Sequence, residues 1–198
     1  MNKFTLPNPL IVFDVETTGV DPRKHDIIEI GAVFVSKGLD IVGRFQSYCR
    51  PYSTERDPEA MGINKIPEET LLEAPGFDAC ALAFEHVAKQ VAESHHHGLR
   101  SFNLAGWGVR FDYDFIGCSY QKAERAFPFS YHTLDIKSLA IWELAKRGCY
   151  LWRKLSGALS ALKIQPVGTA HTALADAENT ARILIELGSQ AHFIPGGY

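Results

Sequence analysis

The first fifty residues alternate between apolar runs and short polar turns. We expect strands at about residues 10–16, 27–35 and 41–49, because apolar and β-branched residues dominate there. Turn-forming residues separate these runs at 21–26 and 37–40. Connections this short favour an antiparallel meander, preceded by a polar lead-in at residues 1–9.

After Pro51 the apolar residues recur at helical spacing. Four prolines fall within residues 51–77, so only short helical pieces fit there. Longer helices and two further short strands are expected to alternate over the rest of the chain. The helices are predicted at about 78–93, from about 111, and at 137–146, 154–162 and 172–187, and the strands at about 99–105 and 131–136. This order predicts one α/β domain over residues 1–198, with a mixed sheet flanked by helices and a short tail at 189–198.

Composition narrows the class of protein without naming a function. The 198 residues are 46% apolar and 22% charged, with a net charge of −3, as in an ordinary globular protein. No run is long and apolar enough to suggest a secretion signal or a membrane span. The four cysteines are far apart, which favours reduced thiols and a cytoplasmic location. The net charge excludes bulk attraction to a polyanion, but it leaves room for bound cations.

Two carboxylates stand at the end of the first predicted strand. Alternate residues of a strand share a face, so Asp14 and Glu16 are expected side by side. Close carboxylates repel each other unless a proton or cation lies between them, and Mg²⁺ prefers such oxygen ligands. The alternative is that Asp14 and Glu16 are ordinary solvated residues at a point where the strand leaves the core and meets water.

A second acidic segment begins the helix predicted near Phe111. Asp112 would stand in its first turn, and we favour it over Asp114 because Phe111 and Phe115, four residues apart, are expected to share a buried face. Taken alone, Asp112 fits a helix N-cap at least as well as a functional site.

A third segment places Asp176 in an apolar helix, five residues after His171. A histidine titrates near neutral pH and can accept a proton from water, although a lone histidine before a helix is more often a surface group. Four carboxylates and one base together match a site in which two divalent ions stabilise both the attacking and the leaving oxygen of a phosphoryl displacement. We therefore expect Asp14, Glu16, Asp112, His171 and Asp176 to act together.

Three motifs carry a resemblance to a known family. The segments Phe13–Gly19 with Ile28–Val33, Gly106–Ile116 and His171–Ala177 resemble, in order, the three motifs of the DnaQ-like DEDDh 3′–5′ exonucleases, including the spacing between His171 and Asp176. The resemblance implies a ribonuclease H-like fold whose five-stranded mixed sheet has its first three strands antiparallel. It also implies two Mg²⁺ or Mn²⁺ ions and release of 5′-monophosphates from 3′ ends. By the same match, the four carboxylates would be metal ligands and His171 the general base.

The chain departs from the family pattern in two places. Family members usually have His-Asn at Trp107-Gly108, and Met61 replaces the histidine of a His-Gly-Ile-Thr element. Both departures concern the handling of the 3′ nucleotide. The residues expected to contact that nucleotide are Thr17, Gly19, Ile63 and Phe111.

Other polar and aromatic groups have two interpretations each. Trp107 would stack on a base or belong to the core, and Lys146-Arg147 and Arg153-Lys154 would contact phosphates or form a solvated face. His95–His97 resembles a metal-binding run of histidines, but three consecutive side chains point in different directions, so we expect a polar loop.

Three functional hypotheses remain from the sequence. The leading one is a 3′–5′ exonuclease acting on single-stranded 3′ ends, with DNA favoured. We expect a free-standing enzyme, with contact with a polymerase as the alternative. The second is RNA 3′-end trimming by the same chemistry. The third is a non-catalytic subunit that binds a polymerase or nucleic acid, which the complete set of five site residues disfavours.

Overall fold

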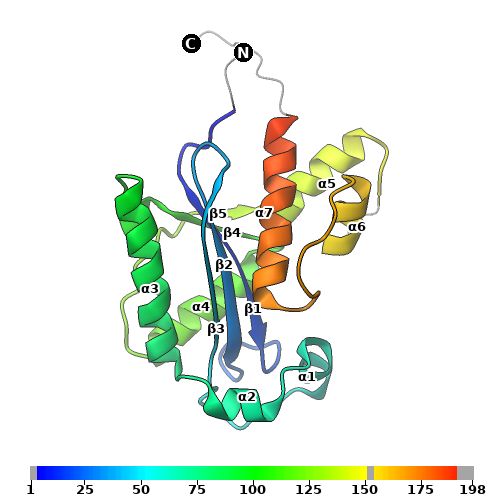
Figure 1. Ribbon diagram of the computed structural model, residues 1–198. Helices are drawn as coiled ribbons and strands as arrows, with labels where there is room; N and C mark the ends of the chain where they lie inside the picture. The colour runs from blue at the N-terminus through cyan, green and yellow to red at the C-terminus, as the bar shows by residue number, and fades with distance from the viewer. Residues whose placement is uncertain (1–3, 151–153, 191–198) are drawn as a thin grey trace.

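One mixed sheet forms the centre of the computed structural model, which describes residues 4–150 and 154–190 (Figure 1). Its strands follow the order β3-β2-β1-β4-β5. They are β1 (Leu10–Thr17), β2 (Ile27–Val35), β3 (Ile41–Tyr48), β4 (Asn103–Gly106) and β5 (Thr133–Asp135). The first three strands are antiparallel neighbours, whereas β4 runs parallel to β1, and β5 to β4. The predicted five-stranded sheet is therefore confirmed.

Helices cover both faces of this sheet (Figure 1). They are α1 (Pro58–Asn64), α2 (Glu68–Glu73), α3 (Phe77–Ser94), α4 (Arg110–Lys122), α5 (Ile136–Lys146), α6 (Leu155–Ala161) and α7 (Ala173–Ser189), with a 3₁₀ turn η1 (Leu99–Ser101). Within the part of the chain that the structure describes, no helix has both the length and the apolar character needed to cross a bilayer.

The alternation of β1 divides the core into two layers. Ile11, Phe13 and Val15 pack with α3 and α4 in one cluster of buried residues. Leu10 and Val12 pack on the opposite face, in a second cluster with α5, α6 and α7. Since every second residue of a strand shares a face, Asp14 and Glu16 continue the layer that α7 covers.

Three local expectations differ from the structure. The strand expected at 99–105 begins only at Asn103, because Leu99–Ser101 forms the 3₁₀ turn. The strand expected at 131–136 is shorter, and Ile136 already begins α5. Ser189, assigned to a tail, is the last residue of α7, and residues 191–198 of that expected tail lie outside the described residues.

Candidate active site

Three carboxylates converge where the end of β1 meets the start of α7. Asp14 and Glu16 project from β1, and Asp176 lies in the first turn of α7. Each offers one oxygen atom, and the three atoms lie within 4.8 Å of one another. Among the described residues, this carboxylate trio (Asp14, Glu16 and Asp176) is the one group of acidic, histidine and cysteine side chains close enough to hold a metal ion.

The neighbouring strand β2 holds the start of α7 against the sheet. Gly31 pairs with Asp14, and a Cβ atom at Gly31 would stand 2.0 Å from the backbone nitrogen of Leu174. Glu29 pairs with Glu16, and its buried carboxylate accepts a 3.2 Å hydrogen bond from the Ala173 N–H. A carboxylate at a helix N-terminus satisfies a free N–H and complements the helix dipole. Sequence reasoning assigned no role to Glu29, whose signal was an acidic residue in an otherwise apolar strand.

Burial and crowding make the ionised forms of these acids unfavourable. Burial, followed by the negative charges of nearby carboxylates, raises the pKa of Asp14 well above its usual value. The same causes raise the pKa of Glu16 to about 8, with Glu29 the strongest neighbour. Burial also raises the pKa of Asp176, although the charge and backbone of His171 oppose this rise. Such a group favours a bound cation or a shared proton at neutral pH.

The donor set fits a hard divalent cation. All three side chains of the trio are carboxylates, and oxygen ligands suit Mg²⁺ and Mn²⁺ better than softer metals. A cation there would offset the like-charge repulsion that raises the pKa of Asp14 and Glu16.

Asp112 reaches the same strand from the opposite face of the sheet. It is buried in the first turn of α4, and its Oδ1 accepts a 3.0 Å hydrogen bond from the Val15 N–H. It is not the N-cap that the alternative interpretation expected, since Val109 holds that position. Burial raises the pKa of Asp112 to about 7, and its charge in turn raises the pKa of Asp14. Asp112 is thus an electrostatic neighbour of the carboxylate trio rather than a member of it.

His171 lies in the turn that precedes α7. Its side chain is exposed and its backbone has φ 62°, a left-handed conformation that is uncommon outside glycine. The structure brings it near Asp176, where it opposes the rise that burial causes in the pKa of that carboxylate. It is not part of the carboxylate trio.

A cavity of about 270 Å³ lies between the end of β1 and α1. Its lining includes Glu16 together with all four residues expected to contact the terminal nucleotide: Thr17, Gly19, Ile63 and Phe111. One expectation about Phe111 is wrong. Its ring lies 4.8 Å from that of Phe115, yet it is 41% exposed whereas Phe115 is buried, so the two do not share a buried face. Exposure makes Phe111 available for contact with a base or sugar.

Asn64, which occupies the threonine position of the His-Gly-Ile-Thr element, also lines this cavity. Sequence reasoning gave it no contact of its own. Its Nδ2 donates to the Thr17 carbonyl at 3.3 Å, and its Oδ1 accepts from the Ile66 N–H at 3.2 Å. The buried amide therefore ties α1 to the end of β1. An Asn at the end of a short helix gave no sequence signal for this long-range bond.

The departures from the family pattern have structural explanations. Met61 packs against the small cluster of Ile28, Ile66 and Leu71, so it fills apolar space. Trp107 is partly buried against the α5–α7 core layer, which favours its interpretation as a core residue. Gly108 has φ 80°, and its N–H donates to Asp135 Oδ1 at 3.0 Å. Glycine adopts this left-handed conformation without strain.

Among the described residues, the remaining charged segments contribute no side chain to the carboxylate trio. Lys146, at the end of α5, and Arg147, directly after it, both pair with Glu143 of that helix, as on a solvated face. Arg153 lies outside the described residues, and Lys154 precedes α6. His95–His97 follows α3 as a mostly exposed turn, in keeping with a polar loop.

Comparisons with known proteins agree with this geometry. The family model RNase_T, described as an exonuclease, matches residues 11–184. The PolC-type DNA polymerase III of Staphylococcus aureus is 28% identical over 186 residues, which cover 91% of this chain. The chain spans about a tenth of the length of such relatives, since the match covers 11% of the polymerase.

Two solved structures show the same fold. The nuclease domain of 3′hExo, described as a DEDDh family member bound to rAMP, aligns with a TM-score of 0.71 and 22% identity, covering 93% of this chain and 92% of that one. The zinc-bound complex of Escherichia coli ExoI with single-stranded DNA aligns with a TM-score of 0.71 and 19% identity, covering 91% of this chain and 40% of that one.

Proposed function

Because the chain belongs to the exonuclease family RNase_T, we propose that it is a metal-dependent 3′–5′ exonuclease that hydrolyses single-stranded 3′ ends to 5′-monophosphates. Membership confirms the predicted resemblance to the DnaQ-like DEDDh exonucleases and identifies the protein as an exonuclease. The direction of hydrolysis, the substrate and the roles of individual residues belong to the proposal.

The observation that carries the proposal is the carboxylate trio. Its three oxygen atoms within 4.8 Å of one another support binding of a divalent cation. We propose Mg²⁺ or Mn²⁺, held as two ions by Asp14, Glu16 and Asp176 with Asp112 as the fourth ligand. When bound, such ions offset the carboxylate charge and stabilise the charge that develops on the phosphodiester. Asp112 would contribute through the oxygen that does not bond to Val15.

We assign proton transfer to His171. Its exposed side chain precedes Asp176 by five residues, and its effect on the pKa of Asp176 supports a position beside the trio. In this role the imidazole accepts the proton of the attacking water, while the carboxylates would hold the metal ions.

We propose that the terminal nucleotide occupies the cavity beside Glu16. Thr17 and Gly19 would contact it through backbone groups, and Ile63 and Phe111 through apolar packing against base and sugar. The cavity of about 270 Å³ and the exposure of Ile63 and Phe111 support this assignment. Contacts of this kind tolerate any base, as an exonuclease requires.

DNA is the favoured substrate, with RNA trimming as the second candidate. The match to PolC-type DNA polymerases supports DNA and suggests contact with a polymerase, while the likeness to a nuclease bound to rAMP supports RNA as the second candidate.

We further propose that the chain acts as one exonuclease domain, supported by two core layers on one sheet. We also propose a cytoplasmic location. The four free cysteines support it, because the cytoplasm keeps thiols reduced.

The decisive experiment uses 5′-labelled DNA and RNA oligonucleotides, single- and double-stranded, with Mg²⁺ or Mn²⁺. The proposal predicts a ladder of products shortened from the 3′ end, strongest for single-stranded DNA, and no ladder in EDTA. Immediate release of a labelled mononucleotide would indicate the opposite polarity and contradict the proposal. Faster degradation of RNA would favour the second candidate.

A further inference from the structure

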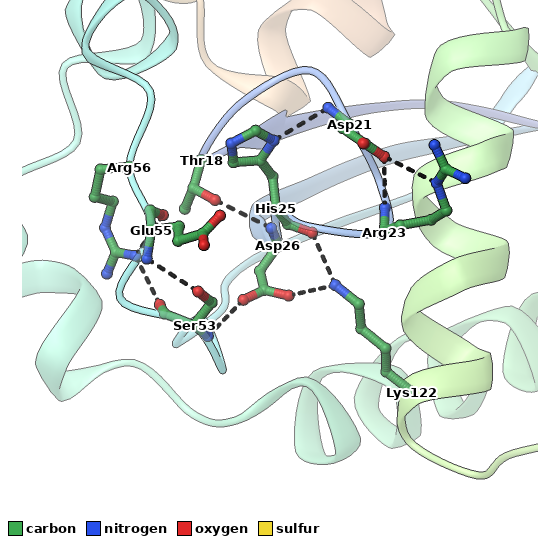
Figure 2. Close-up of polar contacts among 9 residues, drawn as sticks. All are labelled: Thr18, Asp21, Arg23, His25, Asp26, Ser53, Glu55, Arg56 and Lys122. Carbon is green, nitrogen blue, oxygen red and sulfur yellow. Dashed lines mark hydrogen bonds and ion pairs between the residues drawn. The ribbon is translucent and has the colours of Figure 1, made fainter.

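Lys122, the last residue of α4, bonds to the loop that follows β1. Its Nζ donates to Asp26 Oδ1 at 2.7 Å and to the carbonyl of His25 at 2.9 Å (Figure 2). Lys122 is not among the described residues that line the nucleotide cavity. The contact therefore joins the far end of α4 to a segment that reaches the cavity.

Asp26 is the centre of this network. Its side chain is only 6% exposed, and its second oxygen accepts a 2.7 Å hydrogen bond from the Ser53 N–H. Its backbone exchanges two bonds with Thr18, one from the Thr18 N–H at 2.9 Å and one to the Thr18 hydroxyl at 3.1 Å. A buried carboxylate is favourable only when it is paired and hydrogen-bonded, so the network depends on the charge of Lys122.

Both walls of the nucleotide cavity connect to this network. On one side, the His25 ring stands against Gly19, where an added Cβ would lie 2.4 Å from the imidazole, and His25 Nδ1 accepts from the Asp21 N–H at 3.1 Å. On the other side, the Thr18 carbonyl accepts a 2.7 Å bond from the N–H of Asp57, which caps α1. Gly19 and Asp57 both line the cavity.

We propose that the Lys122–Asp26 ion pair is a positioning element for the nucleotide cavity. This inference rests on the proposed function, since it assumes that the cavity receives the terminal nucleotide. The pair holds the β1–β2 loop and the start of α1 in their binding conformation, and it does so without touching the substrate. Lys122 is accordingly a positioning residue rather than a catalytic one.

The position of the network predicts an effect on binding more than on chemistry. Asp14 and Glu16 are fixed by the sheet, and Asp176 by the seating of α7 on Gly31. Asp112 is held by its bond to the Val15 N–H at the opposite end of α4 from Lys122, so the proposed metal ligands do not depend on Lys122. Without the pair, only part of the population would present the formed cavity. Apparent affinity then falls in proportion to that fraction, while the formed complexes react at their normal rate.

Steady-state degradation of a single-stranded DNA oligonucleotide with Mn²⁺ tests the inference. Lys122→Met, which keeps the length of the side chain and removes its charge, should raise KM about tenfold and leave kcat within about twofold. Lys122→Arg should restore KM, because a guanidinium can renew the ion pair.

The chain offers a matched control three residues further on. Arg125 Nη2 pairs with Glu85 Oε1 at 2.9 Å, with a similar side-chain exposure of 24% against 29% for Lys122. This pair also anchors the end of α4, but to α3 rather than to the loop after β1. Arg125→Met should therefore lower the melting temperature and leave KM unchanged.

Three results would overturn the inference. An unchanged KM in folded Lys122→Met, or an equal rise in Arg125→Met, would exclude a specific role of the pair while leaving the proposed function intact. A wild-type protein without exonuclease activity would overturn both. Lys122→Gln serves as a second variant if Lys122→Met fails to fold, since its amide can still donate to the His25 carbonyl but carries no charge to pair with Asp26. It should raise KM in the same direction, and an unchanged KM would again exclude the role.

Discussion

Asp14 is surrounded by four other carboxylates that all disfavour its ionised form. Besides burial, the negative charges of Asp112, Glu16, Asp176 and Glu29 raise its pKa. A fold selected for stability alone would not collect these charges at one point, because each shift is a cost to the ionised folded state. The arrangement is therefore better explained by binding of a cation than by stability.

Neutralising Asp14 should stabilise the metal-free protein. Asp14→Asn removes one charge from the group and keeps the shape of the side chain, so we expect the free energy of unfolding to rise by about 1–2 kcal/mol at pH 8 in EDTA. Urea denaturation measures this change. Asp114→Asn is the control, since it removes only the exposed pair with Arg110, which should change stability by less than about 0.5 kcal/mol. A less stable Asp14→Asn protein would contradict the electrostatic account.

His171 can be tested through the pH dependence of hydrolysis. If it accepts the proton of the attacking water, His171→Ala should lower kcat at least about 100-fold. It should also abolish the increase in rate with pH on the acidic side of the pH–rate profile. The measurement is a pH–rate profile at saturating Mn²⁺. His132→Ala, at an exposed histidine beside β5, should leave the profile unchanged. An unaltered profile in His171→Ala would remove this residue from the base role.

At the scale of residues, local spacing predicted some neighbours and missed others. Alternation along one strand was enough to place Asp14 and Glu16 on one face. The position of Glu29 depends instead on the register between β1 and β2, which local spacing does not reveal. Phe111 was predicted to be buried but is exposed, because helical spacing cannot tell whether a helix end is covered by other residues.

Among the elements, the seating of α7 on β2 decides where Asp176 lies. The backbone of Ala173 and Leu174 approaches β2 at Gly31 so closely that no side chain fits between them. Glu29 adds a hydrogen bond to the Ala173 N–H at the same helix end. Strand and helix thus meet through backbone contact, which sets the position of the third carboxylate.

A methyl group at Gly31 should disturb both stability and metal binding. Gly31→Ala forces α7 outward, so we expect a loss of at least about 2 kcal/mol in unfolding free energy and at least about tenfold weaker Mn²⁺ binding. Urea denaturation and calorimetric titration measure the two effects. Gly62→Ala is the matched control, because nothing lies within 4 Å of its added Cβ in α1 and alanine favours a helix. Equal behaviour of the two variants would contradict the proposed seating.

Helix boundaries were predictable where the helical spacing of apolar residues continues over many residues. The expected helices at 78–93, 137–146 and 172–187 match α3, α5 and α7 within two residues at each end. The short strands β4 and β5 have four and three residues, too few for a clear pattern. Their limits are set by pairing with β1 and with each other, which is a tertiary effect.

For the whole molecule, the two helical layers bring distant segments to one strand. Helix α4 supplies Asp112 from one face, and α7 supplies Asp176 from the other, with β1 between them. The order of motifs along the chain predicted that these segments belong together. It could not predict that Asp112 would bond to the backbone of Val15, because that contact depends on which face each helix covers.

The metal-free protein should lose stability as the pH rises. Glu16 has a pKa of about 8 in the folded protein against 4.5 as its ordinary value, so between these values the folded state holds a proton that the unfolded state has released. The free energy of unfolding should therefore fall from about pH 5 to pH 8 in EDTA and level off above. Urea titrations across this range measure it, and saturating Mn²⁺ should reduce the slope by stabilising the ionised form. A metal-free protein whose stability rises with pH in this range would contradict the assignment.

The central claim is that the carboxylate trio holds the metal on which hydrolysis depends. Its most direct test measures the Mn²⁺-dependent degradation rate of a single-stranded DNA oligonucleotide by the wild type, Asp14→Asn, Asp176→Asn and the control Asp114→Asn. We predict that the wild type and Asp114→Asn degrade the DNA at similar rates, whereas both trio variants fold and lose at least about 1000-fold in rate. Degradation by folded Asp14→Asn at the wild-type rate would contradict the account.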